Sequence, residues 1–497
     1  MLMPTAYDTL LGLIREMGQL ESVESVLDWD QETFMPPNGL PARAEQLSLI
    51  AGLVHERRTH SKVGELLAQL DGQGDFAQAA NVREMRRTYE RATKVPTDLV
   101  RRISKVSALA KAAWVDARSS SNFTAFAPHL AELLELKREV ADRVGYQGER
   151  YDALLDEYEP GATATEVATT FAALRQPLSE FVRELAAAKR QPDPSILTRH
   201  VPRAAQERLS HRLAEAIGFD FQSGRIDVSV HPFCSGTTPG DVRLTTRYLE
   251  NFFPSAIFGT LHEAGHGLYE QGLDPAHVFT PMGHAVSLGI HESQSRMWEN
   301  FVGRSRPFWE HFYPDALKLF TSLADVSLDA FVAAINIVRP SLIRVEADEV
   351  TYNLHIILRF EMERELIGGK LPVKDVPAAW NAKFKELLGI TPPNDRAGCL
   401  QDIHWSMGAF GYFPTYALGN LYAAKFFASI RKAIPDLDDR LRRGEFRTLL
   451  DWLRTNIHRH GQRYRAGELV QVVTGAPLSI DPFMTYVRTK FSAIYGL

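Results

Sequence analysis

Cysteine is nearly absent from this chain, whose 497 residues include only Cys234 and Cys399. Two thiols exclude the kind of secreted fold that a network of disulfides holds together. A single bridge between them, or thiolate binding to a metal, remains as a minor alternative, because buried free cysteine is common in proteins.

Long apolar runs and an excess of one charge are also missing. No stretch approaches the roughly 20 apolar residues that a membrane helix needs, and the N-terminus lacks the pattern of a secretory signal. The 56 basic and 61 acidic residues are interspersed and leave a net charge of −5, which argues against a surface for nucleic acid. We therefore expect a cytoplasmic protein that binds neither nucleic acid nor membrane.

Linkers of Ser, Gly or Pro, fixed-period repeats and low-complexity tracts are absent too, although this length would ordinarily suggest several domains of about 150 residues. Apolar residues recur every three or four positions, as in 130–144, which predicts amphipathic helices that face a core. Together these features predict one mainly α unit over 1–497, with two lobes as one possible arrangement.

A short β segment interrupts the helical pattern. Residues 225–231 alternate polar and apolar side chains, and 236–240 contain the glycines of a turn, so a β-hairpin is predicted with His231 in one strand and 241–245 in the other. An exposed strand edge could pair with an extended peptide. The substrate-contact candidates are then His231, Asp241, Arg243 and Thr245. The alternative is a hairpin that only braces a neighbouring helix.

The strongest chemical signal is the HExxH motif at 262–266. On a helix, His262 and His266 project from one face and can share a metal ion, with Glu263 close enough to act on water at that ion. Zinc accepts imidazole nitrogen and carboxylate oxygen and lowers the pKa of bound water to about 7. The motif predicts a zinc peptidase, and the alternative is a chance match on an amphipathic helix.

Two histidines need a third ligand, and Glu270, Glu292 and Glu299 are the candidates. Glu270 ranks last, because one helix would then have to supply all three ligands. A second helix could present Glu292 to the metal and use Glu299 as support. Glycines and prolines between 272 and 283 predict the loop that lets this helix fold back.

The chain contains an ordered series of further motifs. They are the tryptophan segment 29–37, His-Pro-Phe at 231–233, DxRxT at 241–245, HExxH at 262–266, HESQ at 291–294, IRxxAD at 343–348 and GxxQDxHW at 398–405. This series resembles the pattern of the M32 family of metallocarboxypeptidases. The resemblance implies a mainly helical, two-lobed metallopeptidase with a deep active-site groove. Helices within about 1–220 would form its wall or lid, and 221–420 would carry the catalytic motifs. It also implies a homodimer.

Site roles follow from the same resemblance. It implies His262, His266 and Glu292 as ligands of one Zn²⁺ ion, with Co²⁺ or Mn²⁺ also acceptable to such ligands, and Glu263 as general base. Arg344 would hold the free C-terminal carboxylate of a peptide, because a guanidinium can donate two parallel hydrogen bonds. An ordinary salt bridge to nearby acidic residues is the alternative for Arg344.

Five further residues are candidates by position. Gln401, Asp402 and His404 could bind substrate backbone or support the metal site, whereas Tyr416 and Tyr412 are candidate oxyanion donors, Tyr416 first by resemblance. Packing in an aromatic core is the alternative for both tyrosines.

The sequence thus predicts a metal-dependent carboxypeptidase that releases single C-terminal residues from peptides with broad specificity. An endopeptidase for oligopeptides and a non-catalytic peptide-binding scaffold with a structural metal are the two alternatives.

Overall fold

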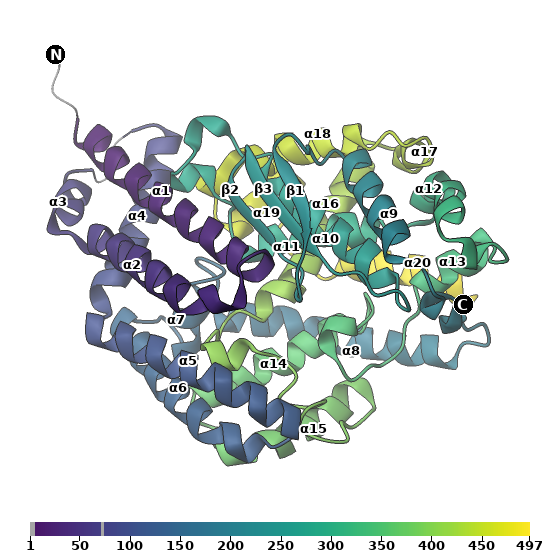
Figure 1. The fold of residues 1–497 in the computed structure, drawn as a ribbon, viewed down its shortest axis with the longest axis horizontal. Coiled ribbons are helices and arrows are strands. Elements are labelled where there is room, and N and C mark those ends of the chain that lie inside the picture. Colours follow the sequence, from purple (N-terminus) through teal and green to yellow (C-terminus); the bar gives the residue numbers. More distant parts are fainter. Residues whose placement is uncertain (1–4, 71–73) are drawn as a thin grey trace. The chain divides into compact units, whose positions relative to one another are not determined.

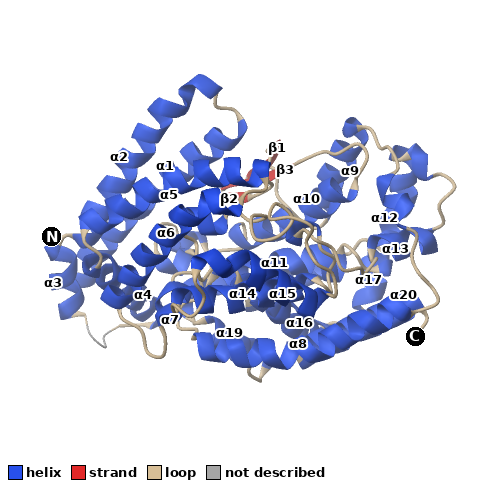
Figure 2. Cartoon of the chain, turned by 90° about the horizontal axis from the view of Figure 1, so that it is seen from below, coloured by secondary structure: helices blue, strands red, loops and turns tan. Residues whose placement is uncertain are grey.

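Helices dominate the computed structural model, which describes residues 5–70 and 74–497 (Figure 2). These residues form 20 α-helices and a sheet of three strands. The predicted mainly α class with a small sheet is therefore confirmed. Among the described residues, no helix is long and apolar enough to cross a membrane.

The chain divides into two compact units, each assembled from three separate stretches. The first unit comprises Met1–Ala92, Pro192–Ile335 and Tyr422–Leu478, and the second comprises Thr93–Gln191, Asn336–Leu421 and Ser479–Leu497. The two ranges expected from the sequence, about 1–220 and 221–420, each contribute to both units, because the chain passes between the units several times.

The first unit contains the sheet and most of the helices. Its helices are α1 (Ala6–Thr33), α2 (Leu40–Thr59), α3 (Ser61–Gln69), α4 (Phe76–Lys94), α9 (Arg203–Ala216), α10 (Pro254–Glu270), α11 (Leu288–Arg296), α12 (Arg306–Leu319), α13 (Leu328–Ile335), α17 (Leu437–Arg442), α18 (Arg447–Asn456) and α19 (Ala466–Thr474). Helix α4 ends two residues beyond the unit's first stretch. In Figure 1, α1 and α2 run side by side as a helical hairpin.

The second unit is helical throughout its described elements. Its helices are α5 (Thr97–Ser120), α6 (Phe123–Val144), α7 (Arg150–Leu155), α8 (Ala164–Ala187), α14 (Tyr352–Ile367), α15 (Val376–Leu388) and α20 (Asp481–Tyr495), while α16 (Pro414–Ala433) begins here and continues into the first unit. Helix α6 confirms the amphipathic helix predicted at 130–144, and its apolar face is buried, with Leu130 and Leu133 fully enclosed.

The sheet differs from the predicted hairpin in one respect. Its strands β1 (Gly224–Val228), β2 (Cys234–Thr238) and β3 (Asp241–Thr246) lie in the order β1-β3-β2 (Figure 1). Strand β1 is parallel to β3, and only β2 is antiparallel to it. The prediction that 225–231 forms the antiparallel partner of 241–245 is therefore wrong, and His231 lies between β1 and β2. Alternation identifies a strand but not its neighbour. Strand β1 also ends at Val228, earlier than the alternating pattern suggests.

Candidate metal centre

Helix α10 carries both histidines of the HExxH motif. Pro254 occupies its first turn, where a missing N–H costs nothing. Most residues of the helix are buried, including Leu261, Ala264 and Leu268. His262 and His266 fall one turn apart on the remaining face. Their side chains are only partly exposed, at 19% and 16%.

Helix α11 folds back on α10 as predicted. The connection contains two short 3-10 turns, at Pro275–His277 and Pro281–Gly283, and the hydroxyl of Ser287 caps α11 by accepting from Ile290 N. The two helices meet at Gly265, where an added Cβ would lie 2.6 Å from Gln294 O and Ser295 Cα. Only glycine permits this approach, which brings Glu292 across from the histidines.

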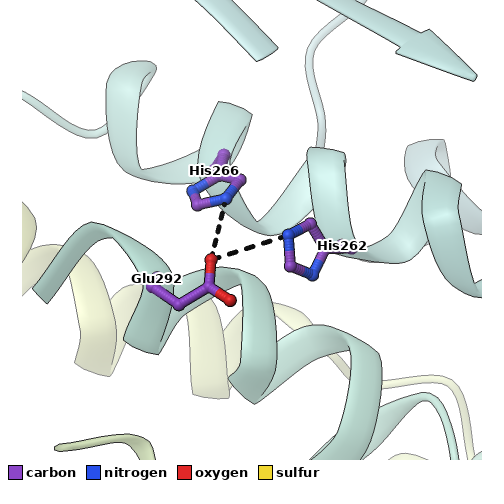
Figure 3. A group of neighbouring side chains, drawn as sticks. All are labelled: His262, His266 and Glu292. Atoms are coloured by element: carbon purple, nitrogen blue, oxygen red, sulfur yellow. Dashed lines mark ion pairs between the residues drawn. The ribbon is translucent and has the colours of Figure 1, made fainter. Parts of the chain in front are cut away.

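The three predicted ligands converge on one point. Glu292 Oε2 lies 3.6 Å from His262 Nε2 and 3.4 Å from His266 Nε2 (Figure 3), and one ligand atom of each residue lies within 4.8 Å of the others. These separations exceed the usual length of a hydrogen bond, about 2.7–3.2 Å. They match the ~3.3 Å that separates two ligands of a tetrahedral ion bound at about 2.0–2.1 Å. The residues therefore fit a zinc-like ion.

Glu299 supports His262 rather than joining the three ligands. Glu299 Oε2 lies 2.9 Å from His262 Nδ1, and Arg296 donates to Glu292 Oε1 at 2.7 Å and to Glu299 Oε2 at 3.0 Å. Arg296 thus leaves Glu292 Oε2 facing the histidines. Glu299 lies in a π-helical turn, Met297–Val302, where the sequence predicts a continuous α-helix. Such turns are frequent at functional sites.

Glu270, the candidate ranked last as a ligand, contacts a different histidine. Its Oε1 lies 2.7 Å from His291 Nε2, and His291 Nδ1 meets His266 Nδ1. The HESQ motif contains His291, but no periodicity or charge pattern in the sequence indicates a partner 21 or 25 residues away. The sequence alone therefore indicates no role for His291.

Burial and neighbouring charges shift the pKa values of the buried groups at this centre. Burial raises the pKa of Glu263 to about 7, with Glu292 and Glu299 adding to the effect of burial. Burial and the neighbouring His291 lower the pKa of His266 to about 3, which keeps this ring neutral. Burial also disfavours the charged form of His262, but Glu292 and Glu299 outweigh it and raise its pKa. The two carboxylates therefore favour a positive charge at this position.

The sheet places the other four candidates of this unit around β3. Asp241 and Arg243 pair with each other at 2.8 and 2.9 Å, and the Arg243 guanidinium stacks 4.3 Å from the Trp29 ring. Thr245 is fully buried and accepts from Ser229 Oγ and Phe233 N. These contacts indicate that Thr245 stabilises the sheet, which agrees with the alternative that this segment braces a neighbouring helix. His231 is exposed on the connection between β1 and β2.

Arg344 lies in the second unit, buried in a cluster of charged groups. It donates from Nε to Asp402 Oδ1 at 2.9 Å and from Nη1 to Tyr352 Oη at 2.8 Å. Arg359, on α14, donates to the other oxygen of Asp402 at 2.6 Å. Burial opposes the charged form of Arg344, but Asp402 outweighs burial and raises its pKa. Two guanidinium groups around one carboxylate leave a local excess of positive charge.

Aromatic rings and amides surround this cluster within the second unit. The Tyr416 ring stacks 4.9 Å from the Arg344 guanidinium, its hydroxyl lies 3.3 Å from His404 Nε2, and the Tyr412 ring is 5.3 Å from that of Tyr416. Gln401 accepts from Arg344 N at 2.9 Å and donates to Leu342 O at 3.1 Å. Gln401 therefore fixes the loop that presents Arg344.

Sequence reasoning missed Arg359 and Tyr352. Both belong to α14, whose residues are buried nearly all round, so no amphipathic stripe marks them. Their burial is what distinguishes these two residues, and burial cannot be read from the sequence.

Both cysteines are free. Cys234 is partly exposed on β2, and Cys399 is buried. Burial raises the pKa of each thiol well above its usual range, so both stay protonated near neutral pH. The structure thus gives no support to the alternative of a disulfide or of thiolate ligation.

A paired-histidine helix with a glutamate supplied from the next helix defines the class of zinc-type metallopeptidases. Comparison with known proteins makes the assignment more specific. The chain belongs to the carboxypeptidase Taq (M32) metallopeptidase family, whose model matches residues 9–491. It is therefore a metallocarboxypeptidase, a hydrolase of peptide bonds, and its family implies a metal ion.

Three relatives illustrate the match. Thermostable carboxypeptidase 1 of Thermus thermophilus is 46% identical over 505 residues, covering 99% of each chain. Carboxypeptidase 1 of Bacillus subtilis is 38% identical and covers 98% of each chain. The crystal structure of an M32 carboxypeptidase from Deinococcus radiodurans superimposes with a TM-score of 0.96 at 40% identity, covering 99% of this chain and all of the other.

Proposed function

We propose that this enzyme removes single residues from the C-termini of peptides, with broad specificity for the last side chain. Its metal is held by His262, His266 and Glu292. The observation that carries the proposal is the convergence of two ring nitrogens and one carboxylate oxygen at the spacing of tetrahedral ligands.

The proposed ion is zinc, although Co²⁺ or Mn²⁺ would accept the same donors. When bound, the ion would polarise the peptide carbonyl and lower the pKa of water to about 7. Glu263 accepts the proton of the attacking water and returns it to the leaving amine. Its buried carboxylate suits both steps, because a group with a pKa of about 7 exchanges protons readily near neutral pH.

Arg344 binds the free C-terminal carboxylate of the substrate in this proposal. A guanidinium has five N–H groups, so it can serve Asp402 and Tyr352 and still donate to an anion. The positive excess around Asp402 supports an anionic ligand, and burial strengthens such an interaction. The salt bridge to Asp402 holds the guanidinium in one orientation.

Tyr416 is the proposed donor to the developing oxyanion, with Tyr412 as the second choice. Both phenols are half-buried, and a preorganised donor of this kind can contribute several kcal/mol to the transition state. His404 holds the Tyr416 hydroxyl and orients it.

A digest of matched peptides tests the proposal. Peptides with a free C-terminus should lose one residue at a time, whereas the same peptides with an amidated C-terminus should be cut at least 100-fold more slowly. Arg344→Lys should weaken cleavage of free peptides selectively, and Arg339→Lys, at an exposed arginine nearby, should match the wild-type enzyme. Equal rates on both peptides, or products from internal cleavage, would favour an endopeptidase instead.

Cytoplasmic location and a homodimer remain predictions of this proposal. Light scattering of the purified enzyme tests the second one directly.

A further inference from the structure

The two proposed histidine ligands are supported in different ways. His262 Nδ1 meets a carboxylate directly, at 2.9 Å from Glu299 Oε2. His266 Nδ1 instead meets the Nδ1 of a second imidazole, His291, whose Nε2 lies 2.7 Å from Glu270 Oε1. Both ligand rings direct Nε2 toward Glu292, so each support acts on the nitrogen that faces away from the metal position.

If His266 binds a metal through Nε2, only one arrangement of protons on His266, His291 and Glu270 is consistent with these contacts. His266 needs a lone pair on Nε2 to bind a metal, so its proton is on Nδ1. That N–H donates to His291 Nδ1, which therefore carries a lone pair. The His291 proton is then on Nε2 and is donated to Glu270. The opposite arrangement would place two N–H groups or two lone pairs face to face.

We infer that His291 is a positioning residue for the metal centre: anchored by Glu270, it holds His266 in the tautomer and orientation that offer Nε2 to the ion. Partners of this kind around a metal-binding histidine raise its basicity and fix its ring. The inference deepens the proposed metal site and rests on that ligand set.

The fold fixes both supporting residues. Glu270 ends α10 with its side chain against β2, where a Cβ added to Gly236 would lie 2.8 Å from Glu270 Cγ and Oε2. The His291 ring lies beside that of Tyr269, with 5.2 Å between centroids. The side chains of His291 and Glu270 are only 17% and 19% exposed, so water competes weakly for the hydrogen bond between them.

Zinc affinity of the metal-free enzyme, measured by competition with a chelator, tests this role. His291→Leu and Glu270→Met should each weaken zinc binding about 10- to 100-fold. His291→Asn keeps an acceptor near the position of Nδ1 and should recover most of the affinity. The visible spectrum of the Co²⁺-loaded protein should change in His291→Leu and resemble wild type in His291→Asn. The exposed His200, 3.6 Å from Glu250, supplies a control, and His200→Leu should bind zinc as the wild type does.

A double variant shows whether Glu270 affects zinc affinity through His291 or only through its negative charge. Because Glu270 acts through His291, Glu270→Met should cause no further loss of affinity in the His291→Asn background. An equal loss in both backgrounds would overturn the inference, as would wild-type affinity in His291→Leu. If His291→Leu fails to fold, as judged by its circular dichroism, the Asn and Met variants still decide the question.

His266→Leu separates this inference from the proposed function. Loss of zinc binding in His266→Leu together with wild-type affinity in His291→Leu would reject the positioning role alone. Wild-type zinc binding in His266→Leu would reject the ligand set itself.

Discussion

Glu263 combines two properties that a general base needs. Its side chain is buried beside His262, on the helix that carries both proposed histidine ligands, and burial raises its pKa to about 7. A carboxylate with an ordinary pKa would be a weaker base, because it would hold a proton less readily near neutral pH. The same burial that disfavours its charge therefore prepares it for proton transfer.

Replacing Glu263 by Gln tests this role. The amide keeps the shape of the side chain but cannot accept a proton, so kcat should fall about 10²- to 10⁴-fold. Metal content, measured by elemental mass spectrometry, should stay at the wild-type value because Glu263 is not a proposed ligand. An active Glu263→Gln enzyme would remove this residue from the mechanism.

The pH dependence of kcat/KM gives a second test at this residue. Glu263 must be ionised to act as a base, so the rate should rise with pH as its proton is lost. The midpoint should fall at or below a pH of about 7, since the pKa of Glu263 is about 7 without an ion and a bound cation favours the carboxylate. The acidic limb should disappear in the residual activity of Glu263→Gln. Persistence of that limb in the variant would assign it to another group.

The contact between helices α10 and α11 positions the three proposed ligands. Gly265 sits in the HExxH motif at a position that the motif leaves unspecified, and its missing side chain lets the two backbones meet. The sequence predicts both helices and the loop between them. It does not reveal this close approach, because the partner backbone lies about 30 residues further along the chain.

Gly265→Ala should therefore separate the two helices. The added methyl group would lie 2.6 Å from backbone atoms of α11, so we expect a loss of about 1–3 kcal/mol in the free energy of unfolding and at least 10-fold weaker zinc binding. Gly259→Ala provides the matched control on the same helix, because its methyl group would meet only Thr246 Oγ1 at 3.8 Å. That variant should be unchanged or slightly stabilised. Normal zinc affinity in Gly265→Ala would show that the spacing of the helices is not critical.

Some features of the fold can be predicted from local sequence patterns, and others depend on contacts between distant segments. The motifs indicate the family, the helical class and the two helices that carry the proposed ligands, because each motif consists of residues close together in the sequence. The parallel pairing of β1 with β3, the π-helical turn at Met297–Val302 and the assembly of each unit from three stretches depend on contacts between distant segments. The positions of Arg359 and Tyr352 beside Arg344 depend on such contacts as well.

Glu363 links distant segments of the second unit and makes stability depend on pH. It accepts from Tyr151 Oη at 2.7 Å, Trp405 Nε1 at 2.9 Å and Gly411 N at 3.0 Å. These contacts give the tryptophan of the GxxQDxHW motif a structural role. Burial raises the pKa of Glu363 from 4.5 to about 7 despite these donors.

Between pH 4.5 and about 7, the unfolded chain therefore loses a proton that the folded chain retains. The contribution of Glu363 to the free energy of unfolding is complete below pH 4.5 and falls as pH rises through this range, by at most about 3 kcal/mol. Urea unfolding of the metal-free protein at several pH values should show a smaller advantage of wild type over Glu363→Gln at pH 7 than at pH 5. A difference independent of pH would contradict the raised pKa.

We propose that the carboxypeptidase activity of this protein depends on one ion held by His262, His266 and Glu292. The most direct test of this proposal is a zinc titration of the metal-free enzyme, followed by the release of C-terminal residues from a peptide. We expect no activity without metal, a linear rise as zinc is added and no further rise beyond one equivalent. Glu292→Gln should show no such recovery at the same zinc concentrations. Full activity without metal, or normal recovery in Glu292→Gln, would contradict the proposal.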